Sequence, residues 1–339
     1  MNILYRENVV NGIAEEKAPF VVSTMPEVWQ IVKDEIGGSP QEVIFVESME
    51  RSYLETVENS IPKVDFVFGI GGGSAIDFAK YIAWKRKLPL TTVPSIVSVD
   101  APVTKEVAIR ESGKVRYIGN VMPEVILVDF SLIKKAPKRL NRAGIGDVIS
   151  IHTALFDWKL AYQRGRERYD EVIARKAKEL IDSLKESIYE IREVTNEGIK
   201  SLMELFVQAN TLCWKFGNSR PEEGSEHFFA YNMEYLTKKH FIHGELVCLG
   251  VIIMSYFQEN NLEEIFEIIE KAGALYRPAD IGTNWNEVLE CLLTLEDYAI
   301  NESLPYSIIN EVEKNRIAEN LDALQKIIEK ESSSLRGKR

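Results

Sequence analysis

The 339-residue sequence has few cysteines, few histidines, no long apolar run and no excess of basic residues. Its three cysteines, Cys213, Cys248 and Cys291, are widely spaced, which favours reduced core residues in a cytoplasmic protein over disulfides or a thiolate metal site. No apolar run approaches the ~20 residues of a membrane span, and the first ten residues lack a secretory-signal pattern. A formal net charge of −11 without a basic stripe argues against nucleic-acid and anionic-membrane partners.

The first part of the chain alternates between short apolar runs and helical patterns. Candidate strands cover residues 20–22, 43–46, 64–68, 90–93 and 125–128. Their continuous apolar character predicts a parallel sheet that helices cover on both faces, so residues 1–138 are interpreted as an α/β dinucleotide-binding domain. Polar and apolar residues alternate on either side of a turn within residues 103–118, which predicts an inserted β-hairpin.

Strand signals stop after Pro137, and helical periodicity takes over. Apolar residues recur every three or four positions along residues 173–191, and similar patterns continue to about residue 330. Residues 139–339 are therefore predicted to form an all-α domain.

The segment FVFGIGGGSAIDFAK, residues 66–80, is the most informative stretch of the α/β domain. An apolar strand breaks into glycines, and a helix follows, with Ser74 and Asp77 spaced as a capping box. This arrangement presents backbone N–H groups and a helix dipole to a phosphate, which predicts that Gly71, Gly72, Gly73 and Ser74 bind a dinucleotide. The alternative is a glycine-rich turn without a ligand.

Other polar residues follow predicted strands, at the edge where such sheets bind ligands. Glu47 is placed to bond ribose hydroxyls and repel a 2′-phosphate, which favours NAD(H) over NADP(H); a solvated glutamate is an equal alternative. Ser95, Ser98 and Asp100 follow the strand at 90–93 and are interpreted as site residues, although an ordinary turn has the same composition.

Only four histidines occur, and two of them stand at predicted helix starts, His227 in GSEHFFAY and His243 in FIHGELVCLG. Asp147, in AGIGDVIS, also begins a helix. One carboxylate and two imidazoles converging from three helices are a common divalent-metal set. From spacing alone, His152 and His240 remain rival ligands.

Six motifs appear in a specific order: GIGGGSAIDFAK, VPSIVSVDAP, ILVDFSLIKKAP, AGIGDVIS, SRPEEGSEH and HGELVCLG. As a set they resemble the iron-containing alcohol dehydrogenase and glycerol dehydrogenase superfamily, over residues 19–258. The resemblance implies a Rossmann-like N-terminal domain and a helical C-terminal domain, in a dehydroquinate-synthase-like architecture. It also implies an NAD(H)-dependent oxidoreductase that carries one divalent metal, with Zn, Fe, Ni or Mn as candidates.

The same resemblance assigns roles to individual residues. The implied metal ligands and catalytic residues are Asp147, His227 and His243. The implied cofactor contacts are Gly71 to Ser74, Ser95, Ser98 and Thr104, beside Glu47. The substrate set is Asp100, Asp147, Arg220 and Tyr231, the last lying one helical turn past His227.

Two subgroups compete within the superfamily. The VDAP at residues 99–102 resembles glycerol dehydrogenases, whereas SRP-x-x-G-x-EH at 219–227 and Asp157-Trp158 resemble sn-glycerol-1-phosphate dehydrogenases. The second set includes Arg220, whose guanidinium suits a phosphate, although an ion pair with Glu222 or Glu223 is the alternative.

The expected reaction is therefore the interconversion of dihydroxyacetone phosphate and sn-glycerol 1-phosphate. The alternatives are a glycerol dehydrogenase, a dehydroquinate-synthase-like lyase and a non-catalytic NAD-binding protein. A small phosphorylated substrate and a homo-oligomeric state are expected with the first.

Overall fold

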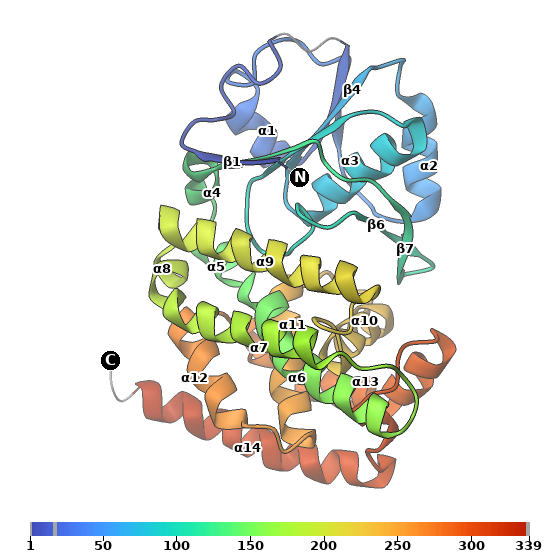
Figure 1. Cartoon of the computed structure of the whole chain (residues 1–339), viewed down its shortest axis with the longest axis vertical. Helices are drawn as coiled ribbons and strands as arrows, with labels where there is room; N and C mark the ends of the chain where they lie inside the picture. The colour runs from blue at the N-terminus through green and yellow to red at the C-terminus, as the bar shows by residue number, and fades with distance from the viewer. Residues whose placement is uncertain (1, 16–18, 337–339) are drawn as a thin grey trace. The chain divides into compact units, whose positions relative to one another are not determined.

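The computed structural model describes residues 2–15 and 19–336, and the chain forms two compact units (Figure 1). The first unit comprises residues 1–144 and 187–210, and the second comprises residues 145–186 and 211–339. The predicted boundary at residues 138 and 139 lies close to the junction after Gly144. Residues 187–210 return to the first unit, although the sequence analysis assigned them to the helical domain.

The first unit contains a six-stranded parallel sheet with the order β1-β8-β5-β4-β2-β3. The strands are β1 (Asn2–Arg6), β2 (Phe20–Thr24), β3 (Glu42–Phe45), β4 (Phe66–Gly71), β5 (Leu90–Pro94) and β8 (Val125–Asp129). Five of them match the predicted runs, so the parallel sheet is confirmed. The prediction missed β1, a short edge strand with alternating burial and no continuous apolar run.

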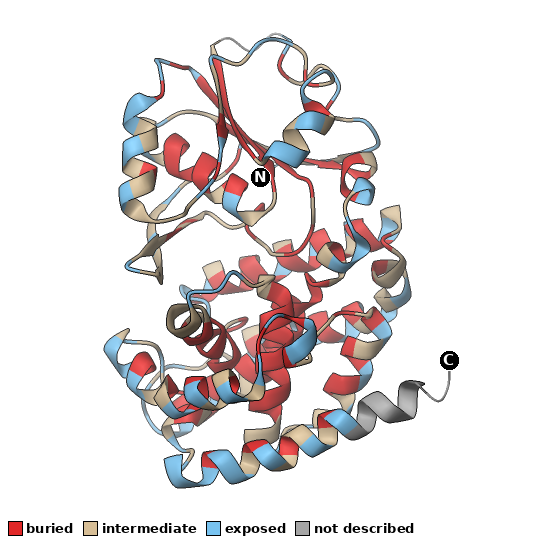
Figure 2. Cartoon of the chain, turned by 180° about the vertical axis from the view of Figure 1, so that it is seen from behind, coloured by how far each residue is buried: buried red, intermediate tan, exposed pale blue. Residues whose placement is uncertain are grey.

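Strands β2, β4 and β5 are buried at every residue because both faces of the sheet are covered there. In β2, Val21 packs in one apolar cluster, while Phe20 and Val22 pack in another on the opposite face. Figure 2 shows buried residues concentrated along the strands. The unit's helices are α1 (Pro26–Val32), α2 (Arg51–Ser60), α3 (Gly73–Arg86), α4 (Phe130–Lys135), α5 (Lys138–Arg142), α8 (Ile188–Glu193) and most of α9 (Asn196–Phe216).

The predicted hairpin is confirmed as β6 (Glu106–Glu111) and β7 (Lys114–Asn120), which pair antiparallel. Its turn residues, Ser112 and Gly113, both have positive φ, at 55° and 76°, as a two-residue hairpin turn requires. The Glu50 carboxylate accepts hydrogen bonds from both of their N–H groups, at 3.1 and 2.7 Å, and so fixes the turn.

The second unit is helical, as predicted. Its helices are α6 (Ile145–Gln163), α7 (Glu171–Glu186), the last turns of α9, α10 (Ser225–Thr237), α11 (His243–Phe257), α12 (Leu262–Ala272), α13 (Trp285–Asn301) and α14 (Ile317–Arg336), with 3₁₀ turns η1 (Pro278–Asp280), η2 (Ile308–Asn310) and η3 (Lys314–Arg316). In the described part of the chain, no helix combines the length and apolar character needed to cross a membrane.

Candidate functional site

Two glycines in the second half of β4 serve the packing of helix α3 on the sheet. A Cβ on Gly69 would lie 2.7 Å from the Ala79 Cβ, and one on Gly71 would lie 2.7 Å from the Ala75 Cβ. Both distances are too short for carbon atoms, so these glycines let α3 approach the strand closely. The Ser23 hydroxyl of β2 reinforces this approach by donating to the Ala75 carbonyl at 2.8 Å.

The capping box predicted for α3 is wrong. Gly72 is the N-cap residue, and no side chain caps the helix. Ser74 is exposed in the first turn, and the Asp77 carboxylate lies 3.3 Å from the Lys80 ammonium instead. Neither Ser74 nor Asp77 therefore caps the first N–H groups of α3. Phosphate binding at the turn of Gly71 to Ser74 remains a prediction.

The turn lies where the winding of the sheet reverses. From β2 the chain passes to β3 on one side, whereas from β4 it passes to β5 on the other side, and β2 and β4 are neighbours. Such a switch point is the usual ligand position in open α/β sheets. Ser95 follows β5 at this same edge, and its N–H donates to the Gly71 carbonyl at 3.0 Å. Ser98 is also buried, and Glu47 is exposed beyond β3.

The remaining predicted residues of the first unit have protein partners. The Thr104 hydroxyl accepts from the buried Lys80 ammonium at 2.6 Å. The Asp100 carboxylate accepts from the Asn210 amide of α9 at 2.7 Å. Burial raises the pKa of Asp77 to about 6, against the opposing influence of Lys80. The structure therefore orients Thr104 and Asp100 through Lys80 and Asn210, two residues that the sequence analysis did not single out.

Asp147, His227 and His243 come together in the second unit, because glycines let three helices touch. A Cβ on Gly146 of α6 would lie only 2.4 Å from the Gly244 carbonyl oxygen of α11. A Cβ on Gly250 of α11 would lie 2.7 Å from the Glu226 carbonyl oxygen of α10. These close approaches stand beside the three predicted ligands, since Gly146 precedes Asp147 and Gly244 follows His243.

The resulting geometry fits a divalent cation. The Asp147 Oδ1 atom lies 3.5 Å from His243 Nε2 and 4.0 Å from His227 Nε2. The two imidazole centroids are 5.4 Å apart. One ligand atom from each residue lies within 4.8 Å of the others, and this is the one such group of histidine, cysteine and acidic side chains among the described residues. An ion about 2.1 Å from each ligand needs ligand atoms about 3 to 4 Å apart, close to what is seen.

Acidic neighbours make this cluster electronegative. Burial by itself would lower the pKa of His227, but Glu226, Glu223 and Asp147 outweigh it and raise the pKa to about 9. Surroundings that favour a proton on this imidazole also favour a metal cation. The His243 side chain is 28% exposed, so the cluster is accessible from one side.

The rival histidines lie elsewhere. His152 Nε2 lies 2.7 Å from the Asn260 carbonyl oxygen, and burial lowers its pKa. His240 is exposed after the end of α10. Tyr231 does lie beside the cluster, with its ring centroid 6.0 Å from that of His227, and its hydroxyl donates to Glu223 at 3.3 Å.

Arg220 is held inside the second unit. Its guanidinium is 1% exposed, donates to the carbonyls of Asp157 and Tyr306 at 3.1 and 2.7 Å, and pairs with Glu167 at 3.0 Å. The predicted partners, Glu222 and Glu223, are not the residues that pair with it in these contacts. Arg220 thus has protein partners in the second unit, and its role as a ligand of a substrate phosphate remains a prediction.

Asp157 and Trp158 belong to the same structural network. The Asp157 carboxylate accepts from the Ser225 N–H and hydroxyl at 2.8 and 2.6 Å and from the Ile308 N–H at 2.8 Å. Trp158 is buried and donates to the Arg168 carbonyl at 2.8 Å. The two subgroup motifs are thus in direct contact, and they fix the start of α10, the helix that carries His227.

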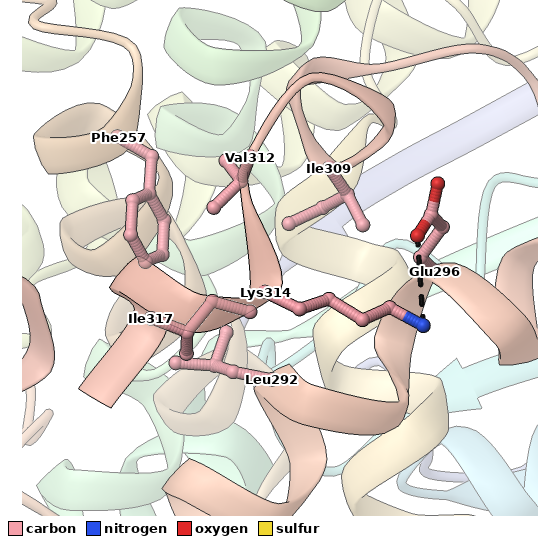
Figure 3. Close-up of a pocket in the computed structure, with 7 residues that line it drawn as sticks. All are labelled: Phe257, Leu292, Glu296, Ile309, Val312, Lys314 and Ile317. Carbon is pink, nitrogen blue, oxygen red and sulfur yellow. Dashed lines mark ion pairs between the residues drawn. The ribbon is translucent and has the colours of Figure 1, made fainter.

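A small pocket elsewhere in the second unit contains none of the predicted residues (Figure 3). Its lining consists of Phe257, Leu292, Glu296, Ile309, Val312, Lys314 and Ile317. Lys314 extends along the pocket toward Glu296, with 3.6 Å between the ammonium nitrogen and the carboxylate. A mostly apolar lining whose two charged groups pair with each other is typical of packing between helices rather than of a catalytic site.

Comparisons with known proteins agree with the fold and the motifs. Residues 10–137 match the family model described as iron-containing alcohol dehydrogenase. The glycerol-1-phosphate dehydrogenase [NAD(P)+] of Thermofilum pendens is 30% identical over 309 residues, covering 86% of this chain and 89% of that protein. The enzyme of the same name from Metallosphaera sedula is 32% identical over 292 residues, covering 82% and 81%.

Solved structures show the same fold. Glycerol dehydrogenase from Schizosaccharomyces pombe matches with a TM-score of 0.76 at 19% identity, covering 98% of this chain and 91% of that one. A probable glycerol dehydrogenase from Sinorhizobium meliloti 1021 gives 0.74 at 18% identity, covering 96% and 97%. These likenesses confirm the predicted architecture, and the identity and coverage of the sequence relatives place the chain in the iron-containing alcohol dehydrogenase family, among relatives named glycerol-1-phosphate dehydrogenase.

Proposed function

We propose that the chain is a metal-dependent NAD(P)(H) oxidoreductase that interconverts dihydroxyacetone phosphate and sn-glycerol 1-phosphate. The assignment of substrate rests on the names of the sequence relatives, which are glycerol-1-phosphate dehydrogenases that use NAD(P)+. The observation that carries the chemistry is the cluster of Asp147, His227 and His243 in one unit of the fold.

The donor set suits the chemistry. Two neutral imidazoles and one carboxylate bind Zn, Fe, Ni or Mn without strong selection among them. A divalent ion held by these three residues would supply Lewis acidity at the C2 oxygen, where negative charge develops as hydride is added to the ketone. The His243 side chain is partly exposed, and this would give a substrate oxygen access to the ion.

The chain itself positions the reactants. The turn at Gly71 to Ser74 would hold the pyrophosphate at the start of α3, with Ser95, Ser98 and Thr104 completing the cofactor contacts. Asp100, oriented by the Asn210 amide, would accept a hydrogen bond from a substrate hydroxyl. Tyr231 and Glu223 form a hydrogen-bonded pair next to His227 and would order water or a substrate hydroxyl there.

Several finer points are part of the proposal. NAD(H) is proposed over NADP(H), because the exposed Glu47 at the sheet edge would repel a 2′-phosphate. A homo-oligomer is proposed on the general prevalence of symmetric assemblies. Glycerol dehydrogenase activity is the second candidate, favoured by the solved structures of that name and by the VDAP segment at 99–102.

The test is a substrate panel with purified protein. We expect oxidation of NADH with dihydroxyacetone phosphate, much faster than with dihydroxyacetone, loss of that activity after exhaustive chelation, and recovery with a divalent metal. Full activity in metal-free protein would refute the metal role. Faster turnover of dihydroxyacetone than of its phosphate would move the assignment to a glycerol dehydrogenase.

A further inference from the structure

Glu226 stands beside the metal ligand His227 and is completely buried, yet each of its carboxylate oxygens has a defined partner. The Oε1 atom accepts from the Gly224 N–H at 2.6 Å and lies 2.9 Å from His227 Nδ1. The Oε2 atom accepts from the Thr153 hydroxyl at 2.7 Å. The Gly224 N–H and the Thr153 hydroxyl therefore fix both carboxylate oxygens independently of the contact with the imidazole.

This contact determines which imidazole nitrogen is available to a cation. A carboxylate only accepts hydrogen bonds, so His227 Nδ1 must carry the proton that it shares with Glu226. The other nitrogen, Nε2, is the one 4.0 Å from Asp147 Oδ1. In the neutral ring that a metal ligand requires, the hydrogen bond thus selects the tautomer with its lone pair directed to the cluster.

Thr153 ties this arrangement to the helix that carries another ligand. It lies on α6, within two turns of Asp147, while Glu226 and His227 lie on α10. The bond between Thr153 and Glu226 therefore links the helix that carries His227 to the helix that carries Asp147. Gly250 of α11 packs directly on the Glu226 backbone, which leaves this residue little freedom.

We propose that Glu226 is a positioning residue that orients His227 and strengthens it as a metal ligand, with Thr153 as the support that holds Glu226 in place. The inference rests on the proposed metal site. Glu226 lies in the SRP-x-x-G-x-EH motif, but the sequence predicted no role for it or for Thr153, because a glutamate and a threonine 73 positions apart carry no pattern that links them. An acceptor on the second nitrogen of a metal-bound histidine fixes the ring and raises its basicity, and its loss typically costs 10- to 100-fold in metal affinity.

The experiment measures Zn²⁺ affinity of the metal-free protein by competition with a chelating dye, together with the absorption spectrum of the Co²⁺ form. Glu226→Gln is the informative variant, because its amide oxygen can still accept at the Oε1 position while the negative charge is removed. We expect this variant to bind Zn²⁺ roughly 10- to 100-fold more weakly than the native chain and to change the Co²⁺ spectrum.

Asp157→Asn is the matched control. Asp157 is also a buried carboxylate near the start of α10, where it accepts from Ser225, but it contacts none of the three ligands. We expect this variant to bind Zn²⁺ within about twofold of the native chain, even where its melting temperature is lower. Equal weakening in both variants would show that Glu226 only stabilises the helix, and would overturn the proposal.

The remaining outcomes separate the role of Glu226 from the existence of the metal site. Native Zn²⁺ affinity in Glu226→Gln, with tight binding in the native chain, would refute the role of Glu226 and leave the metal site standing. A native chain that binds no Zn²⁺ or Co²⁺ would refute the metal site itself, and the inference about Glu226 with it.

Discussion

Replacing Gly146 by Ala should abolish tight metal binding while the protein remains folded. Gly146 precedes Asp147 in α6, and its ideal Cβ position is 2.4 Å from the Gly244 carbonyl oxygen and 2.7 Å from the Gly244 Cα. Ordinary contact for a Cβ begins near 3.4 Å, so the two backbones must separate by about 1 Å. Neither contact is with a flexible side chain, and so no rotamer change relieves it.

The separation acts directly on the ligands. The distance between Asp147 Oδ1 and His243 Nε2 is 3.5 Å, and a rigid shift of about 1 Å would extend it to about 4.5 Å. Two atoms that each lie about 2.1 Å from one ion are at most about 4.2 Å apart. We therefore expect Zn²⁺ affinity to fall at least about 100-fold, with a matching loss of metal-dependent activity.

Stability should change far less than affinity. Overpacking costs about 1 to 3 kcal/mol, and the better helix propensity of alanine offsets about 1 kcal/mol of that. Gly198→Ala is the control, because its Cβ would lie 2.1 Å from the Glu190 carbonyl in the first unit, far from the ligands in the sequence. We expect it to lower the melting temperature without affecting Zn²⁺ binding. Native Zn²⁺ affinity in Gly146→Ala would refute the idea that this helix contact sets the ligand spacing.

Two further predictions concern the network around Arg220 and Asp157. Arg220→Ala should destabilise the fold by about 3 kcal/mol in urea unfolding, because it leaves Glu167 and the carbonyls of Asp157 and Tyr306 without their partner. At temperatures where the variant is folded, activity should fall equally with dihydroxyacetone phosphate and dihydroxyacetone; a loss confined to the phosphate ester would restore Arg220 as a phosphate ligand. Burial raises the pKa of Asp157 to about 6, above its unfolded value near 3.8, so the folded state binds this proton more tightly and gains stability as pH falls. Between pH 7 and pH 5 the native chain should gain about 1 kcal/mol relative to Asp157→Asn, and a difference that stays constant with pH would contradict the raised pKa.

The sheet could be predicted because burial on both faces gives a strand a continuous apolar sequence. Strands β2, β4 and β5 are entirely buried and were recognised on that ground. Strand β1 was missed because an edge strand needs only alternate apolar residues, and five residues of NILYR form too short a pattern. The helical return of residues 187–210 to the first unit depends on tertiary packing, for which helical periodicity gives no signal.

The metal cluster shows a different limit. Spacing alone offered five candidate ligands, and only the ordered motifs favoured Asp147, His227 and His243 over the rivals. The structure brings these three within reach of one ion, while His152 pairs with a backbone carbonyl. For Arg220 the sequence sets a similar limit, because a guanidinium that stabilises a buried network has the same sequence appearance as one that binds a phosphate.

Three glycines explain why the metal cluster is well defined in the structure although the spacing of its ligands in the sequence is a weak signal. Gly146 permits α6 to meet α11, and Gly250 permits α11 to meet α10, so each close approach involves backbone atoms rather than adjustable side chains. Gly224 completes the arrangement, because its Cβ would lie 2.8 Å from the Ala154 Cα of α6. With all three helix pairs in backbone contact, the ligand distances are set by main-chain geometry, which a metal site needs to hold within a few tenths of an ångström. The hydrogen bonds of Glu226 then determine only the orientation of the His227 imidazole. We therefore expect their loss to weaken metal binding, while Asp147, His227 and His243 stay close together.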